Sequence, residues 1–286
     1  MHTDRLEALL QRFRVSARLF HSGPLCGVND FAPEQGRGQL HLLSGGELRV
    51  EHPDGTAITV DEPSLLFYPR PHAHRFVSDT DRGADMACAF IEFGDGARNP
   101  LTAALPACIA LPLSALDGTA PVLDLLFREA FAQHCGRQLI VDRLFEVVLI
   151  QILRLQMAKA PERSGLFAGL AHPQLSRALI AMHGEPGQAW TLASLAEVCG
   201  MSRTQFAETF RARVGITPPG DYLAGWRLTV AQQLLDEGRA LKHIVDAVGY
   251  GSVAALSRAF KAQTGSSPRD WRKARDTGTN RVRDVL

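Results

Sequence analysis

The sequence lacks any uninterrupted apolar run long enough to cross a membrane, for which about 20 residues are needed, although 45% of its 286 residues are hydrophobic. Its first residues are charged and have helical spacing, without the apolar core of a secretory signal. Membrane-spanning and secreted proteins are therefore not expected. We expect a cytoplasmic protein whose length suits two domains.

Cysteine is scarce, and its count is odd: Cys26, Cys88, Cys108, Cys135 and Cys199. Such a set in a cytoplasmic chain excludes a scaffold held together by disulfides. Cys199 falls on the apolar face of an expected helix, where packing is its ordinary role. Cys26 lies in a loop rich in Gly and Pro, where its thiol is expected to be exposed, and Cys88 lies in an expected strand.

The whole chain also lacks an excess of either charge, because its formal net charge is +1. This balance hides two unlike halves. Residues 171–286 contain 15 Lys and Arg against 10 Asp and Glu, a net charge of +5, whereas residues 1–170 contain 16 against 20, a net charge of −4. A basic half suits attraction to phosphate groups, and an acidic half does not. We therefore expect two domains with different functions, joined by a linker over residues 161–170.

One pattern occurs twice in the basic half, with its copies fifty residues apart. Residues 202–218 and 252–268 share a serine, large apolar residues, a phenylalanine, a basic residue, a glycine and a proline at equal offsets. Each copy follows a segment with apolar residues at helical spacing, which Gly200 or Gly249 interrupts. Helix, glycine-containing turn and helix together form the helix-turn-helix unit. Two ordinary helical hairpins would look similar, but the tandem repetition favours binding to duplex DNA.

The outward face of the second helix in each copy is expected to contact DNA. The candidate residues lie off the apolar stripe: Ser202, Arg203, Thr204, Ala207, Glu208 and Arg211 in the first copy, and Val253, Ala254, Ser257, Arg258 and Lys261 in the second. Arginine reads guanine, glutamate accepts from cytosine, and valine or alanine can meet a thymine methyl group. Arg211, Lys261 and the helix N-termini suit phosphates. A helix over residues 221–235 is expected to hold the two readers about 34 Å, or one DNA turn, apart.

Over residues 171–275 the chain resembles the DNA-binding domain of AraC/XylS-type transcription regulators. The resemblance is carried by residues 190–196, 201–203, 206–210, 215–218, 222–223, 226–228, 248–250, 260–261 and 265–268. It implies seven helices, two recognition helices in successive turns of the major groove, and control of promoter DNA together with RNA polymerase. Activation is the expected mode, although repression stays open. The second motif of the family often has polar residues where this chain has Val253 and Ala254, so weak base readout by that helix is expected, carried by Ser257 and Arg258.

Short strand-like runs separated by turns fill residues 15–95 and predict a small antiparallel barrel or jelly roll. Residues 61–74 look like the second motif of a cupin, and the region is similar to the cupin-type sensor domains that precede such DNA-binding domains. The expected fold class is therefore α+β: an N-terminal antiparallel, cupin-like β-barrel with a helical pair, followed by an all-α domain with tandem helix-turn-helix units. The expected parts are a sensor domain over residues 1–160, the linker, the DNA-binding domain and a loose tail over residues 276–286.

The helical pair is expected within residues 120–160, where apolar stripes run from Leu123 to Phe131 and from Leu144 to Leu155. In the family such a pair often makes the dimer contact, which implies a homodimer. The alternative, equally open, is that the pair only covers the barrel.

A closer resemblance concerns the signal. A subgroup of cupin-containing AraC-type regulators senses reactive chlorine through an N-terminal loop cysteine and a second cysteine in a late barrel strand, and Cys26 and Cys88 fall at matching places. The resemblance implies that Cys26 is oxidised to a sulfenic acid, which Cys88 resolves as a disulfide, so that the sensor changes state. The alternative is that both cysteines are incidental small apolar residues and that the barrel responds to a small ligand or a metal.

His41 and His74 occupy plausible ligand positions of a cupin, and imidazole suits Zn, Cu, Fe or Ni. The usual second histidine and the glutamate of a first cupin motif are missing, because Leu42 and Leu43 follow His41 and Glu47 is the nearest acid. We therefore expect no enzyme and no cofactor, apart from a possible transition metal at His41 and His74. Otherwise these histidines are polar residues satisfied inside the barrel.

Overall fold

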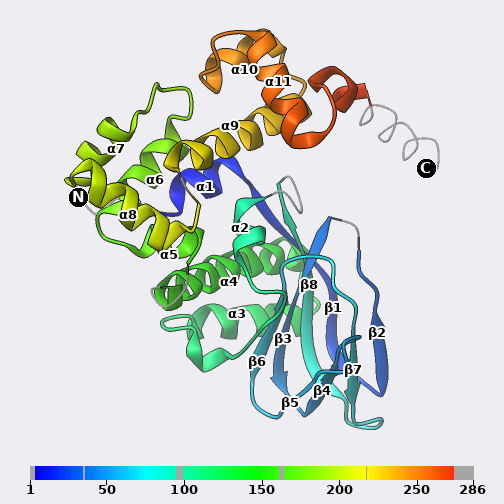
Figure 1. The fold of residues 1–286 in the computed structure, drawn as a ribbon. Coiled ribbons are helices and arrows are strands. Elements are labelled where there is room, and N and C mark those ends of the chain that lie inside the picture. The colour runs from blue at the N-terminus through cyan, green and yellow to red at the C-terminus, as the bar shows by residue number, and fades with distance from the viewer. Residues whose placement is uncertain (1–3, 35, 95–98, 161–163, 217, 274–286) are drawn as a thin grey trace. The chain divides into compact units, whose positions relative to one another are not determined.

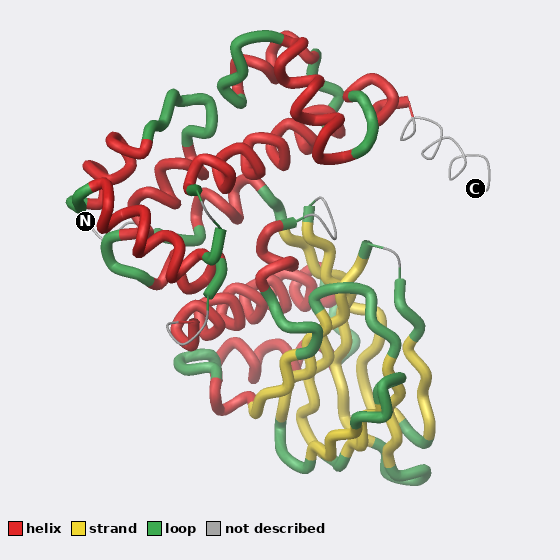
Figure 2. The backbone as a smooth tube through the Cα atoms, viewed as in Figure 1, coloured by secondary structure: helices red, strands yellow, loops and turns green. Residues whose placement is uncertain are grey.

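The computed structural model describes residues 4–34, 36–94, 99–160, 164–216 and 218–273. The chain divides into two compact units. Leu10–Lys159 forms the first, which we call the sheet unit, and Met1–Leu9 together with Ala160–Leu286 forms the second, which we call the helical unit. Figure 1 shows the elements of both, and Figure 2 shows strands confined to the sheet unit. No described helix is long and apolar enough to span a membrane.

The sheet unit contains two antiparallel sheets. The five-stranded sheet has the order β1 (Val15–Leu25), β8 (Ala84–Phe93), β3 (Arg37–Gly45), β6 (Ser64–Tyr68) and β9 (Ile109–Pro112). The four-stranded sheet has the order β2 (Val28–Phe31), β7 (His74–Ser78), β4 (Leu48–Glu51) and β5 (Ala57–Val60). Their facing side chains form one core, with these members among others: Leu43, Leu48, Val50, Leu66, Tyr68, Phe76, Met86 and Cys88. The runs that alternate in the sequence thus become strands with one buried face.

The expected barrel does not close, and the sheets remain two separate layers. The outer edge of β1 shows why. The backbone amide of Leu19 donates to Asp142 Oδ1 at 2.7 Å, and that of Ala17 donates to Glu146 Oε1 at 3.4 Å. Both acceptors lie on α4 (Arg137–Lys159). Because a helix satisfies these edge amides, no further strand is needed beside β1.

The helical pair of the sheet unit consists of α3 (Ala120–Phe131) and α4, which pack on each other and against β1. The expectation of two packed helices is therefore confirmed, and covering the sheet is one of their roles. Two short helices complete the N-terminal part of the chain: α1 (Glu7–Arg12) at its start and α2 (Pro100–Ala104) after β8.

The helical unit contains α5 (Leu166–Ala171), α6 (Leu175–Gly184), α7 (Leu192–Cys199), α8 (Arg203–Val214), α9 (Pro219–Asp236), α10 (Leu241–Ala247) and α11 (Val253–Thr264). The helix expected over 221–235 is α9, and it reaches both repeats. Its Tyr222 packs edge to face on Phe210 of α8, with 5.6 Å between ring centroids, and its Asp236 Oδ1 accepts from the indole of Trp271 at 3.1 Å. Trp271 in turn packs edge to face on Phe260 of α11.

The structure differs from the expectation of a linker over residues 161–170. Residues 161–163 lie outside the described residues, but Leu166–Ala171 forms the buried helix α5, which packs on α6 and α8. Its apolar side chains, Leu166, Phe167 and Leu170, explain the difference, because they gain more from packing than from exposure. The N-terminus also differs, since Arg5 Nη1 donates to the carbonyls of Leu170 and Ala171 at 3.1 and 3.0 Å and so belongs to the helical unit. The expected loose tail lies outside the described residues.

Candidate DNA interface and effector site

The two repeats of the sequence form two helix pairs with matching caps. Ser202 Oγ accepts from the amide of Gln205 at 3.2 Å, and Ser252 Oγ accepts from that of Ala255 at 3.1 Å. Gly215 and Gly265 end α8 and α11 in the left-handed region, with φ of 80° and 78°. The caps thus begin and end the two candidate reading helices at equivalent residues.

The buried faces of α8 and α11 also correspond. Phe206 and Phe210 anchor α8, and Leu256 and Phe260 anchor α11 at the same offsets. The turn before α11 is close-packed, because a Cβ on Gly249, whose φ is +69°, would lie 2.4 Å from the carbonyl oxygen of Gly187. Gly200, in the turn before α8, has a similar φ of +64° with open space around it. Each helix is therefore held on one side and free on the other, as a reading helix must be.

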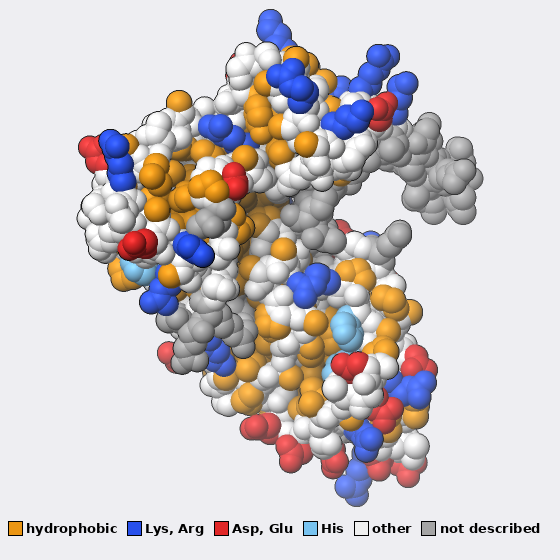
Figure 3. All heavy atoms as spheres, viewed as in Figure 1, with side chains coloured by type: hydrophobic (Ala, Val, Ile, Leu, Met, Phe, Trp, Pro, Cys, Tyr) orange, Lys and Arg blue, Asp and Glu red, His pale blue; other side chains and the backbone are white. Residues whose placement is uncertain are grey.

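The candidate DNA contacts lie on the free side. Ser202, Arg203, Thr204, Glu208 and Arg211 are exposed on α8, with Ala207 half-buried. On α11, Val253, Ala254, Arg258 and Lys261 are exposed and Ser257 is half-buried. Figure 3 shows Lys and Arg side chains with hydrophobic ones between them on the surface of the helical unit around α10 and α11. Basic side chains around a protruding helix suit the phosphates that flank a major groove.

A cluster of aromatic and histidine side chains fills the space between the two sheets. Phe31 stacks on His74 with 5.0 Å between ring centroids, and Tyr68 stacks on the same histidine at 4.1 Å. Around them lie Phe20, His41, Phe76 and Phe90. The Tyr68 hydroxyl lies 2.9 Å from Nε2 of His52, and burial raises the pKa of Tyr68. The cluster is apolar in its walls and polar at a few points, as ligand sites are.

His41 and His74, the two candidate metal ligands, lie together at the centre of this cluster. Their Nε2 atoms are 3.1 Å apart, and His74 Nδ1 lies 3.0 Å from the carbonyl oxygen of His72. His74 therefore donates from Nδ1 and accepts at Nε2, so that His41 donates from Nε2. His41 Nδ1 is then a buried acceptor that has no partner among the described residues. Burial lowers the pKa of both histidines, that of His74 to about 4, and both are neutral at pH 7.

The pair does not make a complete metal site. Within the described ranges, no group of three or more His, Cys, Asp or Glu side chains is placed to hold one ion. Protein sites for transition metals use three or four such ligands. The two imidazoles are instead hydrogen-bonded to each other through their Nε2 atoms.

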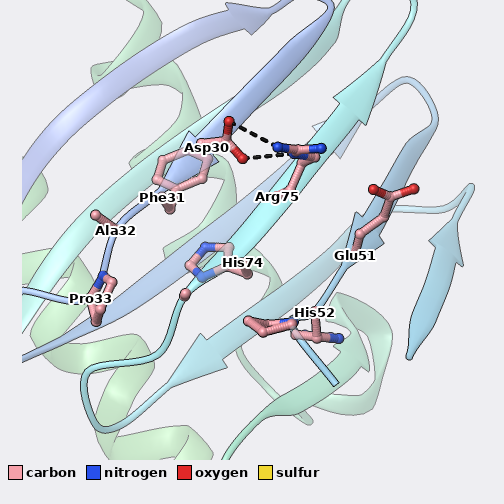
Figure 4. A pocket seen from close by; sticks show the side chains of 10 residues that line it. Asp30, Phe31, Ala32, Pro33, Glu51, His52, His74 and Arg75 are labelled. Atoms are coloured by element: carbon pink, nitrogen blue, oxygen red, sulfur yellow. Dashed lines mark hydrogen bonds and ion pairs between the residues drawn. The ribbon is translucent and has the colours of Figure 1, made fainter. Parts of the chain in front are cut away.

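A pocket of about 520 Å³ opens beside this cluster, where β2 and β4 end and β7 begins. Its walls combine Phe31, Ala32, Pro33, Pro53 and Ala73 with Asp30, Glu51, His52, His74 and Arg75. Figure 4 shows Phe31 and His74 on one side of the Asp30–Arg75 ion pair, with Glu51 and His52 across from them. Arg75 Nε and Nη2 reach the two carboxylate oxygens of Asp30 at 2.7 and 3.2 Å.

Of the residues that line this pocket, His74 was predicted from the sequence as part of a site and the others were not. Asp30 and Phe31 stand directly opposite Arg75 and His74 in the β2–β7 ladder. Strand β2 has only four residues, VNDF, which are too few to show an alternation of apolar and polar residues. The pairing that brings these residues together depends on the fold of distant segments, which one sequence does not reveal.

The two candidate redox cysteines lie apart. Cys26 is exposed in the turn after β1, where a Cβ on Gly83 would come within 2.7 Å of its Sγ, whereas Cys88 is buried in β8. In the β1–β8 ladder Leu25 faces Ala84, but Cys88 faces His21, four residues further along the strand. Four residues of strand span about 13 Å, and a disulfide needs Cα atoms within about 7 Å. In this conformation the pair is therefore not placed to form the expected bond.

Comparison with known proteins agrees with the two units. Residues 4–158 match a family described as cupin, and residues 195–274 match a family described as a helix-turn-helix domain. An AraC-like transcription regulator of Streptomyces antibioticus is 38% identical, over 94% of this chain and 97% of its own length. The HTH-type transcriptional regulator AlkR of Acinetobacter baylyi is 32% identical, over 82% of this chain and 87% of its own.

A third relative is more distant. The RCS-specific HTH-type transcriptional activator RclR of Escherichia coli is 26% identical, over 86% of this chain and 89% of its own length. All three relatives are named as transcription regulators and none as an enzyme. Regulators with the AraC-type helix-turn-helix domain bind promoter DNA. This chain belongs to the AraC family of transcription regulators, with an N-terminal cupin domain and a C-terminal helix-turn-helix domain.

Proposed function

We propose that this regulator binds its operator with α8 and α11 and responds to a small organic molecule held in the pocket between Phe31 and Pro53. The observation that carries the proposal is the pocket itself, which has apolar walls and a few polar groups beside a buried histidine pair. The ligand has an apolar body that packs on Phe31 and at least one polar group that pairs with His52, His74 or the Asp30–Arg75 ion pair.

The operator contacts divide between the two helices. On α8, Arg203 and Glu208 have the chemistry for guanine and cytosine edges, and Arg211 suits a phosphate. On α11, Arg258 occupies the position that Glu208 has on α8, and its side chain is exposed. Ser202 and Ser252 cap the helix ends that approach the groove, where free backbone amides suit phosphate.

Arg258→Ala is expected to weaken binding to the native operator by about 1–3 kcal/mol, measured by fluorescence anisotropy at fixed salt. The reason is the loss of a charged side chain that pairs with a base or a phosphate. Arg154→Ala, which removes an exposed arginine from α4, serves as the matched control and leaves the affinity unchanged. Equal affinities for all three proteins would contradict the assignment of α11.

The effector site is tested by filling the pocket. Phe31→Trp is expected to abolish the response of promoter output to the effector while the affinity of the effector-free protein for the operator stays unchanged. Val28→Trp is the control, because Val28 lies on the same strand, is 61% exposed and does not line the pocket. A screen of small molecules by thermal shift on the full chain supplies the ligand. A Phe31→Trp protein that still responds would overturn this site.

A second candidate signal is an oxidant, favoured by the name of the relative RclR and by the exposure of Cys26. In this version hypochlorous acid oxidises Cys26 to a sulfenic acid, and a rearrangement of the β1–β2 turn brings a second thiol, proposed to be Cys88, within reach. Cys26→Ser separates the two signals, since it removes an oxidant response and leaves a ligand response intact. Cys135→Ser, at the other exposed cysteine, is the control, and peptide mapping under non-reducing conditions identifies any bond.

Two partners belong to the proposal besides DNA. The first is RNA polymerase, through which a bound regulator acts on transcription, with activation as the proposed mode. The second is another copy of this chain. The outward faces of α3 and α4 carry exposed apolar side chains, Phe131, Leu139, Ile140 and Val147, and such faces suit an interface.

A further inference from the structure

The two reading helices begin with chemically opposite turns. The first three residues of α8 are Arg203, Thr204 and Gln205, and all are exposed. The equivalent residues of α11 are Val253, Ala254 and Ala255. The caps and buried anchors of both helices correspond, so these three positions occupy equivalent places. The first turn of α11 therefore presents methyl groups where that of α8 presents hydrogen-bonding groups.

The apolar turn is not part of the core. Val253 is 43% exposed, and Ala254 is exposed beside it. The apolar anchors of the same helix, Leu256 and Phe260, are fully buried one and two turns later. Exposing Val253 to water contributes nothing to the fold of the helical unit. Its side chain is available for contact with another surface.

The surroundings indicate which surface that is. Arg258 and Lys261 stand exposed on the same helix, and basic side chains of this kind attract phosphates. The N-terminal residues of a reading helix contact base edges in the major groove. In that groove the only apolar group that any base presents is the C5 methyl of thymine. Valine and alanine cannot donate or accept hydrogen bonds, so a methyl is the one feature they can distinguish.

We propose that Val253 and Ala254 make α11 a reader of thymine methyl groups. The half-site of α11 therefore contains thymine, whereas α8 reads its own half-site through hydrogen bonds. This inference rests on the proposed binding of DNA by both helices. It revises the expectation that α11 reads bases weakly, because shape and apolar contact replace hydrogen bonds there. Lys261 supplies a phosphate contact that holds the apolar turn in the groove, and Arg258 contacts a base edge further along the helix.

The test first selects the operator from random duplexes with the full chain and assigns the α11 half-site by the Arg258→Ala variant. Each thymine of the site is then replaced by deoxyuridine, which removes the C5 methyl and keeps the Watson–Crick pair. With the wild-type chain, we expect each contacted methyl in the α11 half-site to contribute about fourfold in affinity. With Val253→Ser, thymine and deoxyuridine operators are expected to bind equally at the position that Val253 contacts.

Deoxyuridine in the α8 half-site is the internal control, since its effect should be the same for Val253→Ser and wild type. An α11 half-site without thymine, a wild-type chain indifferent to deoxyuridine there, or a Val253→Ser chain that keeps the thymine preference overturns the inference while DNA binding stands. Failure to select any specific site overturns the proposed function together with it. A circular dichroism spectrum like that of wild type shows that Val253→Ser is folded.

Discussion

His74 shows at the scale of one residue how the interior of the sheet unit depends on pH. Burial lowers its pKa to about 4 in the folded chain, whereas an unfolded histidine titrates near 6.5. Between these values the unfolded state binds a proton that the folded state does not. Folding stability is therefore full above about pH 6.5 and falls as the pH drops toward 4.

We expect the sheet unit to lose about 2 kcal/mol of stability between pH 7 and pH 5 from this one group. Hydrogen-exchange mass spectrometry on β7 peptides, with rates corrected for the chemical effect of pH, measures it. His74→Phe should make the dependence shallower, because phenylalanine keeps the stacking on Phe31 and has no proton to bind, while His41, whose pKa is also lowered, keeps its share. His243→Gln, at an exposed histidine of the helical unit, is the comparison. The same slope in wild type and His74→Phe would show that other groups carry the dependence.

At the scale of elements, the edge of β1 depends on two carboxylates of α4. Asp142→Ala leaves the Leu19 amide without its acceptor, and an unsatisfied buried amide costs about 1–3 kcal/mol. We expect faster hydrogen exchange in β1 and a lower midpoint of thermal unfolding. Asp124→Ala removes an exposed carboxylate from α3 and should change neither. Unaltered exchange in the Asp142→Ala chain would mean that the edge is held by packing alone.

The helix caps give a second result at this scale. Ser202→Ala and Ser252→Ala each remove a side chain that accepts from the third helical amide, which costs about 1 kcal/mol. The two variants should destabilise the helical unit equally, because their capping geometry is equivalent. A urea titration followed by tryptophan fluorescence measures both, because Trp190, Trp226 and Trp271 all lie in the helical unit. A large cost for only one of them would contradict the equivalence of the repeats.

The elements also show what the sequence could and could not predict. The strands from β3 to β8 and the helices from α7 to α11 follow local periodicity, glycine breaks and serine caps, which are written in short stretches of chain. Three other features depend on partners far along the chain: the short strand β2, the contacts of the α4 carboxylates with β1, and the helix α5. The pocket was missed for this reason, since Asp30 and Arg75 meet only through the β2–β7 ladder. The placement of Cys26 and Cys88 likewise follows from strand register, which one sequence does not fix.

At the scale of the whole molecule, the exposed apolar faces of α3 and α4 predict a homodimer. Ile140 and Val147 stand about two turns apart on α4, 41% and 39% exposed. Replacing both with glutamate should give a monomer by analytical ultracentrifugation, because charge would then have to be buried in the interface. Lys159→Glu changes charge at an exposed residue of the same helix that lies off this stripe, and it serves as the control. A wild-type chain that sediments as a monomer at micromolar concentration would contradict the predicted dimer interface.

The central claim is that two equivalent helices of one chain read two adjacent stretches of major groove. Missing-nucleoside interference on the selected operator, with the full chain, tests it most directly. We predict two groups of essential bases whose centres lie about 10 base pairs apart. Arg203→Ala should relax the requirement for the bases of one group, and Arg258→Ala the requirement for those of the other. A single group of essential bases, or both variants relaxing the same group, would contradict the account.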